Sequence, residues 1–490
     1  MTVAPRTTEH LREVPPQEQR LGALERLELL CDPGSLRAIR SAVTSHRMGA
    51  KARAGDGVVG GAGRVDGRPV YCYAQDASFA GGSLGAAHAD TIVRVLQLAR
   101  EARVPAIGFV ESGGARMQEG TAALGGYGRI FREHVRASGL IPQISVICGT
   151  SAGGGSYSPA LTDFVMMTRD SRMFLTGPGI VAEAMGEQVT ADELGGPKVH
   201  ERNGVCQFVA EDDAHAIHLT RELLSYLPQN AHAAAPTRPF PTRFGGDPGS
   251  CVPREARRVY DVRDVLRLIA DSGRYLEVSE RWARNMVTAF ARIEGESVGV
   301  IANQPKYIGG TIDAAGAQKA ARFVRTCNSF GLPLLVLVDT PGFLPGTKQE
   351  AAGVIRHGAK LLHAFAEATV PKLTVVLRKA FGGAYITMNS RDLGADFAFA
   401  WPDAEIGVMG AKQAVGIIQR REIAAADDPE AARDELADAY AEEHLSAQLA
   451  ASEGFIDEVI EPEETRDRVA WGLTSLPKPR GAPRAGNIPL

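Results

Sequence analysis

Two stretches of this chain repeat each other at an offset of 228 in the residue numbering. Residues 64–82 (RVDGRPVYCYAQDASFAGG) align without a gap with residues 292–310 (RIEGESVGVIANQPKYIGG). A period of this length far exceeds the roughly 20 to 50 residues of solenoid repeats, so it indicates a duplicated domain. A chain of 490 residues is also too long for one hydrophobic core. We therefore expect two similar domains and a function that uses two equivalent sites.

Composition excludes several classes of protein. Hydrophobic residues make up 44% of the chain and charged residues 23%, and the net charge is −4, so nothing favours a nucleic-acid partner. No stretch of about 18 apolar residues could cross a membrane, and the start lacks the apolar segment of a secretory signal. The six scattered cysteines include no CxxC pair, which predicts reduced thiols and no metal site. We expect a cytoplasmic protein without a membrane partner.

The repeated segments have the pattern of an α/β fold. Asp66-Gly67 and Glu294-Gly295 are typical of tight β-hairpin turns. A helical pattern follows each Gly-Gly pair (81–82 and 309–310), and a buried strand follows each helix, at 104–110 and 332–338. This order predicts parallel strand pairing in each half.

The remaining segments set the expected domain boundaries. Residues 1–18 are polar and are expected to form a flexible arm, followed by a helix with Leu21, Leu24, Leu27 and Leu30 on one face. The Pro- and Gly-rich segment 227–254 is typical of a linker, so we place one domain at 19–240 and the other at 241–490. An amphipathic helix is expected at 428–448, before a Pro- and Arg-rich tail at 477–490.

Both halves retain a glycine cluster after a buried strand. Residues 152–157 read AGGGSY and residues 380–385 read AFGGAY, each before a helix of small residues. A strand that turns through glycine into a helix leaves backbone N–H groups free to bind an anion, such as a phosphate or the oxyanion of a thioester enolate. Glycines in such turns also serve close packing alone, but their repetition favours a binding role.

The alignment of the two clusters is ambiguous by one residue. An offset of 228 pairs Gly154-Gly155 and Tyr157 with Gly382-Gly383 and Tyr385. An offset of 229 instead pairs Gly153-Gly154 with Gly382-Gly383, and Pro142 with Pro371. The sequence alone does not decide between the two.

Other polar residues near these turns favour structural roles. Glu111 and Asp339 end the two central strands, where acids commonly cap the next turn, although a general base is the alternative. The DTPG at 339–342 is similar to a nucleotidase DxxG, but the chain has no GxxxxGK[ST] motif. We expect His88 to be a solvated helix residue, and Tyr157 and Tyr385 to be packing residues.

Long segments resemble one family, the carboxyltransferase (β) subunits of biotin-dependent acyl-CoA carboxylases of the acetyl/propionyl-CoA type. The matching strings include SGGARMQEG (112–120), YSPALTDF (157–164), FLTGPGIV (174–181), GGTIDAAGAQKAARFV (309–324), DTPGFLPGTKQE (339–350), RKAFGGAYITMNS (378–390), WPDAEIGVMG (401–410) and the terminal GNIPL. Together the matches cover most of residues 20–490.

The resemblance implies a fold, a reaction and an assembly. The fold would be two tandem crotonase-like domains, each a spiral of ββα units. The reaction would move CO2 from N1-carboxybiotin to the α-carbon of an acyl-CoA, which creates two anions and therefore needs two oxyanion holes. The free ureido anion can remove the α-proton, so no protein base is needed. The family also implies a homo-hexamer, a trimer of dimers, with active sites at the dimer interfaces.

The resemblance also implies roles for individual residues. The N-terminal cluster Gly153, Gly154 and Gly155 would hold the acyl-CoA carbonyl, and Gly382, Gly383 and Ala384 would hold the biotin oxygen. Substrate-binding positions would be Gly113, Gly114, Ala115, Tyr157, Tyr385 and Ile386. Propionyl-preferring relatives carry Asp where this chain has Ile386, so an acetyl-accepting or broad-range enzyme is implied. Relatives often have Ala at Gly155.

The chain contains no biotin-attachment AMKM segment and no ATP-grasp signature that we can identify. We therefore expect biotin to be carried by a partner, a biotin carboxylase/biotin carboxyl carrier (α) subunit. One alternative is the carboxyltransferase subunit of a sodium-pumping acyl-CoA decarboxylase, and another is a non-catalytic scaffold that binds CoA or a carrier protein. A crotonase-type hydratase or isomerase is disfavoured because it would need one domain with a placed carboxylate.

Overall fold

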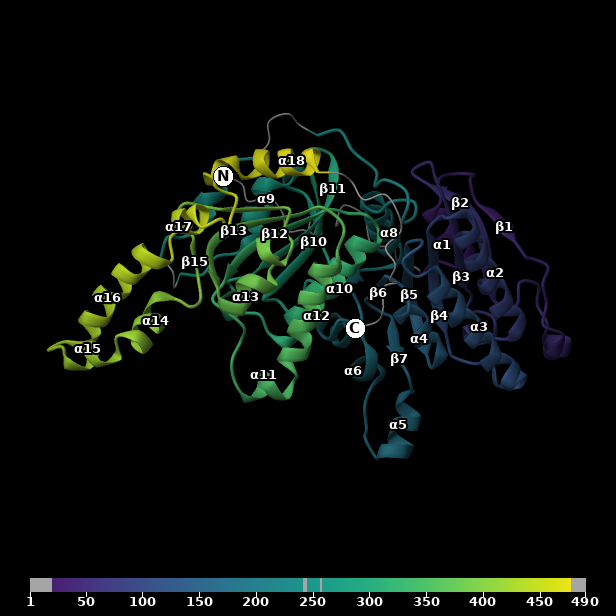
Figure 1. The fold of residues 1–490 in the computed structure, drawn as a ribbon. Helices are drawn as coiled ribbons and strands as arrows, with labels where there is room; N and C mark the ends of the chain where they lie inside the picture. The colour runs from purple at the N-terminus through teal and green to yellow at the C-terminus, as the bar shows by residue number, and fades with distance from the viewer. Residues whose placement is uncertain (1–19, 241–244, 256–257, 477–490) are drawn as a thin grey trace.

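The structure is a computed structural model that describes residues 20–240, 245–255 and 258–476. In this part of the chain the strands form two sheets of eight strands each, which lie side by side with helices around them (Figure 1). The first sheet has the order β1-β2-β3-β4-β5-β6-β8 and the second β16-β14-β13-β12-β11-β10-β9; β7 and β15 pair with β5 and β13. The predicted arm and tail lie outside the described residues.

The elements of the first half are β1 (Arg37–Ile39), β2 (Val58–Val65), β3 (Arg68–Gln75), β4 (Ala106–Ser112), β5 (Gln143–Ala152), β6 (Phe164–Thr168), β7 (Arg172–Phe174) and β8 (Phe208–Ala210), with α1 (Ala23–Leu30), α2 (Ala86–Ala102), α3 (Thr121–Ala137), α4 (Gly154–Ala160), α5 (Pro178–Met185), α6 (Ala191–Gly195), α7 (Pro197–Asn203) and α8 (Asp213–Tyr226).

The elements of the second half are β9 (Tyr275–Glu277), β10 (Met286–Ile293), β11 (Glu296–Asn303), β12 (Leu334–Thr340), β13 (Lys372–Phe381), β14 (Phe397–Ala400), β15 (Glu405–Gly407) and β16 (Glu458–Val459), with α9 (Val262–Ile269), α10 (Ala314–Ser329), α11 (Thr347–Ala351), α12 (Val354–Glu367), α13 (Gly382–Thr387), α14 (Ala411–Ile418), α15 (Arg420–Ala425), α16 (Pro429–His444), α17 (Ala447–Ser452) and α18 (Thr465–Ser475).

The predicted hairpins and parallel pairing are confirmed. Strand β2 runs antiparallel to β3, and β10 to β11, through turns whose central residues have positive φ (Asp66 49°, Gly67 77°, Glu294 51°, Gly295 79°). Strands β3, β4 and β5 are parallel, as are β11, β12 and β13. Helices α2 and α10 cross between the strands, as the apolar spacing predicts.

The first helix differs from its prediction. Leu27 and Leu30 are buried, but Leu24 is 47% exposed. A spacing of three falls short of a full helical turn, so successive leucines drift off a single face. Arg26 is buried in this helix, where its guanidinium pairs with Glu111 and Asp213, each at 3.0 Å.

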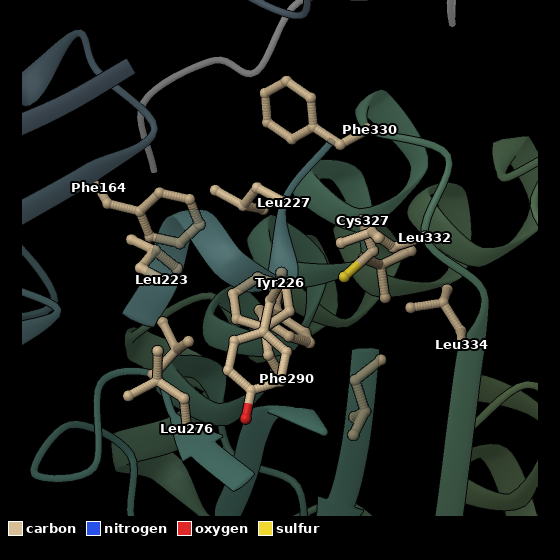
Figure 2. Packing of buried hydrophobic residues seen from close by; sticks show 14 of the residues in the cluster. Phe164, Leu223, Tyr226, Leu227, Leu276, Phe290, Cys327, Phe330, Leu332 and Leu334 are labelled. Atoms are coloured by element: carbon tan, nitrogen blue, oxygen red, sulfur yellow. The ribbon is translucent and has the colours of Figure 1, made fainter. Parts of the chain in front are cut away.

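The two halves share one hydrophobic core at their junction. Phe290 of β10 packs against Phe164 of β6 and Tyr226 of α8, with ring centroids 6.0 Å apart in both pairs (Figure 2). It also packs against Phe323 of α10, at a centroid distance of 5.0 Å. One continuous cluster of buried residues extends from this point into both sheets. The duplicated halves therefore pack against each other through a shared core.

Two helical arms project from this body. Helix α5 follows β7 in the first half, and helices α14 to α16 follow β15 in the second (Figure 1). The predicted acidic helix corresponds to α16, and the Asp428 side chain caps its first turn. No helix among the described residues has the length and hydrophobicity to cross a membrane.

A lysine is buried at the junction of the two halves. Lys319 of α10 is 3% exposed, and its Nζ donates to the carbonyl oxygen of Trp282 at 2.9 Å. Burial lowers its pKa to about 8, against the attraction of Glu277. Burying this cation costs folding free energy, because the ammonium group has left water and donates to a neutral carbonyl oxygen.

We expect Lys319→Met to stabilise the chain by about 1 to 3 kcal/mol at pH 7. Between pH 8 and the ordinary lysine pKa the unfolded chain binds more protons than the folded chain, so wild-type stability rises with pH in that window. The gain in the variant should therefore shrink by pH 10. Thermal unfolding of the wild type and the variant at pH 7 and pH 10 measures this gain in stability. An equal gain at both pH values would contradict the buried charge as the cause of the gain.

Candidate active site

The glycine clusters form matching strand-to-helix turns. Gly153 lies between β5 and α4, and Gly382 follows β13 as the first residue of α13; both have a φ of 58°. Their positive φ values mark the same position in the two copies, at an offset of 229. The sheet register agrees, since Val110 pairs with Ile147 and Val338 with Val376. The offset is therefore 228 at β4 and 229 at β5.

The register of 229 decides which site residues correspond. Gly154 is equivalent to Gly383, and Gly155 to Ala384. Tyr157 is equivalent to Ile386, so the pairing of Tyr157 with Tyr385 that an offset of 228 gives is wrong. The extra residue lies between β12 and β13, where two helices, α11 and α12, replace the single helix α3.

The fold requires some of these glycines but not all. A Cβ on Gly154 would approach the Tyr127 ring to 2.7 Å, and one on Gly382 would approach the Val408 carbonyl oxygen to 2.9 Å. On Gly155 it would come within 3.3 Å of Ser151 Oγ, a contact that a small shift can accommodate. Gly383 has no positive φ and no atom within 4 Å of its Cβ position. Packing therefore does not explain Gly383.

Backbone N–H groups without an intrahelical acceptor lie at the start of both helices. The first N–H groups of a helix have no intrahelical acceptor. In α4 these are the N–H groups of Gly154 and Gly155, and in α13 they include those of Gly383 and Ala384. Both helices start at the carboxyl ends of central parallel strands, so each half presents backbone donors at an equivalent edge of its sheet.

A second glycine turn lies beside each helix start. In the first half, the Gly113 N–H donates to the Gly81 carbonyl oxygen at 3.0 Å, and a Cβ on Gly114 would lie 3.5 Å from the Ala152 carbonyl oxygen. Ala115 pairs with Leu84 in an isolated parallel bridge. The structure thus brings the predicted residues 113–115 next to the turn at 80–82 and to the helix start.

Gly81 and Gly309 are two further residues of these turns, and no role was predicted for them from the sequence. Their φ values are 62° and 64°, and a Cβ on either would meet nothing within 4 Å. Like Gly383, they leave open space at the edge of the sheet. The signal that could have revealed them was the Gly-Gly pair that the two copies share.

The strand-end acids form ion pairs. Glu111 contacts the guanidinium groups of Arg20 at 2.7 Å and Arg26 at 3.0 Å. Asp339 contacts Arg378 at 3.0 Å, and burial raises the pKa of Asp339 more than Lys379 and Arg378 lower it. Neither acid caps the next turn with its side chain, so that expectation is wrong. Both carboxylates are held by cations, which does not favour a general base.

The three larger side chains near the helix starts differ in their surroundings. Tyr157 is 53% exposed and contacts Phe131 edge-on, with centroids 6.3 Å apart. Ile386 is 48% exposed. Helical side chains lean toward the preceding turn, so Tyr157 and Ile386 cover equivalent positions beside Gly154 and Gly383. Tyr385 packs against the core, and its hydroxyl donates to the Phe455 carbonyl oxygen at 3.2 Å.

His88 is fully buried, which contradicts its expected exposure to solvent. Its exposed fraction is 0%, and burial lowers its pKa to about 3. A buried ion-pair cluster lies beside it, in which Arg116 contacts Asp56 at 2.6 Å and Glu119 at 2.8 Å. The helical pattern of α2 could not show this, because Asp56 and Arg116 come from distant segments.

Two cavities lie near the carboxyl ends of the strands. A cavity of about 550 Å³ opens at the ends of β4 and β5 and is lined by Arg20, Ala77, Gly81, Glu111, Ser112, Gly113, Gly149, Thr150, Asp170 and Arg172. The larger cavity, about 710 Å³, lies at the junction of the halves near β8 and β9, away from the glycine turns. The smaller cavity is lined by Gly81 and Gly113, so it adjoins the second glycine turn of the first half.

The fold and the site define a duplicated α/β protein that presents backbone donors for two oxyanions. A family model described as "Carboxyl transferase domain" matches residues 16–480. A propionyl-CoA carboxylase carboxyltransferase subunit from Haloferax mediterranei is 48% identical over 483 residues, which cover 96% of this chain and 94% of that protein. A methylmalonyl-CoA decarboxylase subunit alpha from Veillonella parvula is 46% identical and covers 96% and 93%.

A solved structure is similar over nearly the whole chain. The transcarboxylase 12S crystal structure, described as a hexamer assembly with methylmalonyl-coenzyme A bound, has a TM-score of 0.91 and 46% identity, and covers 96% of this chain and 92% of that one. The chain belongs to the carboxyl transferase domain family. Its fold is the tandem crotonase-like fold, and it is an enzyme of the acyl-CoA carboxyltransferase type.

Proposed function

We propose that this chain transfers CO2 from carboxybiotin on a partner protein to the α-carbon of a short-chain acyl-CoA. The observation that carries this proposal is Gly383, a glycine that packing does not require at one of two equivalent donor turns. Open space beside free N–H groups fits the close approach of a ligand oxygen. The transfer generates two oxyanions, which matches two turns of this kind.

The two halves are assigned different oxygens. In the first half, the Gly154 and Gly155 N–H groups stabilise the negative charge that forms on the thioester oxygen when the α-carbon loses its proton. In the second half, the Gly383 and Ala384 N–H groups stabilise the charge that forms on the biotin oxygen when the N–CO2 bond breaks. The ureido nitrogen takes up the α-proton, and the α-carbon forms the new bond to CO2. The ion-paired Glu111 and Asp339 take no part in proton transfer.

Each site is assembled from two copies of the chain, with the first half of one copy facing the second half of the other. The similarity to a hexameric transcarboxylase core supports this arrangement. The projecting arms also carry exposed apolar side chains: Ile180 (60%) and Met185 (77%) on α5, and Ile417 (68%) and Ile418 (69%) on α14. Exposed apolar side chains on projecting helices fit a surface that a second copy covers. In the proposed assembly, the homo-hexamer is built as a trimer of such dimers.

Reconstitution tests the proposed direction and substrate. The chain would be combined with a biotinylated α partner, bicarbonate and ATP, and offered acetyl-, propionyl-, butyryl- and longer acyl-CoAs. We expect carboxylated product from at least one short-chain acyl-CoA. A similar decarboxylase subunit makes the reverse reaction the second candidate. Decarboxylation that requires a membrane partner, without carboxylation in this assay, would support that candidate and contradict the proposal.

Ile386→Asp is expected to shift the substrate preference toward propionyl-CoA. The Ile386 side chain is about half exposed beside the second donor turn, where it can line the acyl pocket of a facing copy. One methylene in an apolar pocket is worth about 1 to 3 kcal/mol, so the ratio of the two kcat/KM values should change by about tenfold or more. Competition assays with acetyl- and propionyl-CoA measure this ratio. An unchanged ratio would remove Ile386 from the acyl pocket.

A further inference from the structure

In each half, a buried amide side chain binds the backbone at the end of a central strand, β4 in the first half and β12 in the second. Gln75, the last residue of β3, accepts the Glu111 N–H at Oε1 (3.1 Å). Asn303, the last residue of β11, accepts the Asp339 N–H at Oδ1 (3.3 Å). Gln75 is 4% exposed and Asn303 0%. The same offset of 228 relates the two amides and the two acids, so the contact is repeated at equivalent positions.

The other side of the same peptide packs against a glycine. A Cβ on Gly82 would overlap the carbonyl oxygen of Glu111, and a Cβ on Gly310 would overlap that of Asp339. The strand end is thus held by an amide at its N–H and by the glycine turn at its C=O. Any shift of this peptide would move the turns at 80–82 and 308–310 with it.

The halves differ in the second contact of the amide. Asn303 Nδ2 donates to the Gly310 carbonyl oxygen at 3.3 Å, which connects the strand end directly to its turn. Gln75 Nε2 lies 3.1 Å from His88 Nε2. Because Gln75 Oε1 is the acceptor for Glu111, its Nε2 is the donor, which assigns the ring proton of His88 to Nδ1.

The length of the amide side chain and the acceptor of its NH2 group differ together between the two copies. The counterpart of His88 is Gly316, which has no side chain to accept a hydrogen bond. The longer glutamine occurs where a histidine is available, and the shorter asparagine where the turn carbonyl is the nearest acceptor. Because burial holds the pKa of His88 at about 3, its ring is neutral and remains an acceptor near pH 7.

We infer that Gln75 and Asn303 are positioning residues. They hold the strand end at Glu111 or Asp339, and the glycine turn at 80–82 or 308–310, in the relative position that the oxyanion site of each half requires. This inference rests on the proposed function. Donors act in a transition state only when they are held within about 0.5 Å of the productive geometry, and a displacement of about 1 Å can cost about a hundredfold in rate.

The test uses the full chain and the reverse half of the reaction, transfer of the carboxyl group from malonyl- or methylmalonyl-CoA to free biotin. Asn303→Leu and Gln75→Met retain the size of each side chain and remove its polar atoms. We expect kcat to fall about 10- to 100-fold while both KM values stay within about twofold. Asn303→Asp keeps the acceptor for Asp339 and loses the donor to Gly310, so its kcat should lie between those of Asn303→Leu and wild type.

Thr374→Val is the matched control. Thr374 is 2% exposed in β13, and its hydroxyl donates to the Asn389 carbonyl oxygen at 2.7 Å and accepts from Asn389 Nδ2 at 2.9 Å, beyond the C-terminal end of α13. This variant also loses buried hydrogen bonds in the same half, but its kcat should stay near that of wild type. If wild type is active and Asn303→Leu loses thermal stability with an unchanged kcat, Asn303 is merely structural and the inference is wrong. An inactive wild-type chain would instead contradict the proposed function itself.

Discussion

Gly383→Val is expected to reduce carboxyl transfer about 100- to 1,000-fold while leaving the fold and the assembly intact. The valine keeps the backbone N–H, but its side chain would occupy the space through which the biotin oxygen reaches that donor. Blocking it should cost about as much as removing one preorganised oxyanion donor, about 2.7 to 4 kcal/mol of barrier. The fold should tolerate the change, because no atom lies within 4 Å of the Gly383 Cβ position and its φ is not positive. Steady-state transfer to free biotin measures the loss.

Gly128→Val is the control for this substitution. Gly128 lies in α3, likewise without a positive φ and with no atom within 4 Å of its Cβ position. The chemical change is the same, but the site is outside the donor turns, so activity should remain near wild type. Near-normal turnover of Gly383→Val would remove the second oxyanion hole from the mechanism.

Arg116→Met is expected to destabilise the chain by about 3 to 5 kcal/mol, the cost of leaving buried carboxylates without their cation. The side chains of Arg116, Asp56 and Glu119 are all 0% exposed, and Arg116 contacts both acids. Burial already raises the pKa of Asp56 in the wild type against the attraction of Arg116. Without the cation, Asp56 should bind a proton more readily when folded than when unfolded, whereas the pKa of Glu119, which hydrogen bonds from Ala86 and Ser45 also lower, should rise toward its ordinary value.

The pH dependence of Arg116→Met tests this cause. A raised folded-state pKa means that stability is lost as pH rises and recovered as pH falls, so the deficit should be smaller at pH 5 than at pH 8. Chemical unfolding at both pH values measures it. Arg129→Met is the control, because Arg129 and Asp90 pair at 2.8 Å with side chains 37% and 49% exposed, and such a pair is worth about 0 to 1 kcal/mol. A pH-independent deficit would indicate lost packing alone.

The sequence predicted the features that depend on local pattern. Hairpin turns such as Asp66-Gly67, the helices after each Gly-Gly pair and the parallel strands all follow from turn chemistry and hydrophobic periodicity, and the structure has them. The duplication itself came from direct alignment. The segments that carry the glycine turns were likewise predictable from the sequence, because both copies retain them.

Features that depend on three-dimensional contacts were not predictable. The offset changes from 228 to 229 between β12 and β13, and only the matching φ of Gly153 and Gly382 and the sheet register reveal it. His88 is buried because segments distant in sequence surround it, which helical periodicity does not record. The ion pairs of Glu111 depend on Arg20 and Arg26, which lie far before it in the sequence.

Mixed assemblies test the central claim, that each active site combines the first half of one copy with the second half of another. One variant would carry Gly154→Ala, whose Cβ would meet the Tyr127 ring at 2.7 Å, and the other Gly383→Val. Each should be nearly inactive alone. After unfolding and refolding together in equal amounts, half of the dimers contain one copy of each variant, and one of the two sites in such a dimer has both halves intact. Transfer to free biotin should therefore recover to about a quarter of wild type. No recovery in oligomers shown to contain both variants would contradict a site shared between copies.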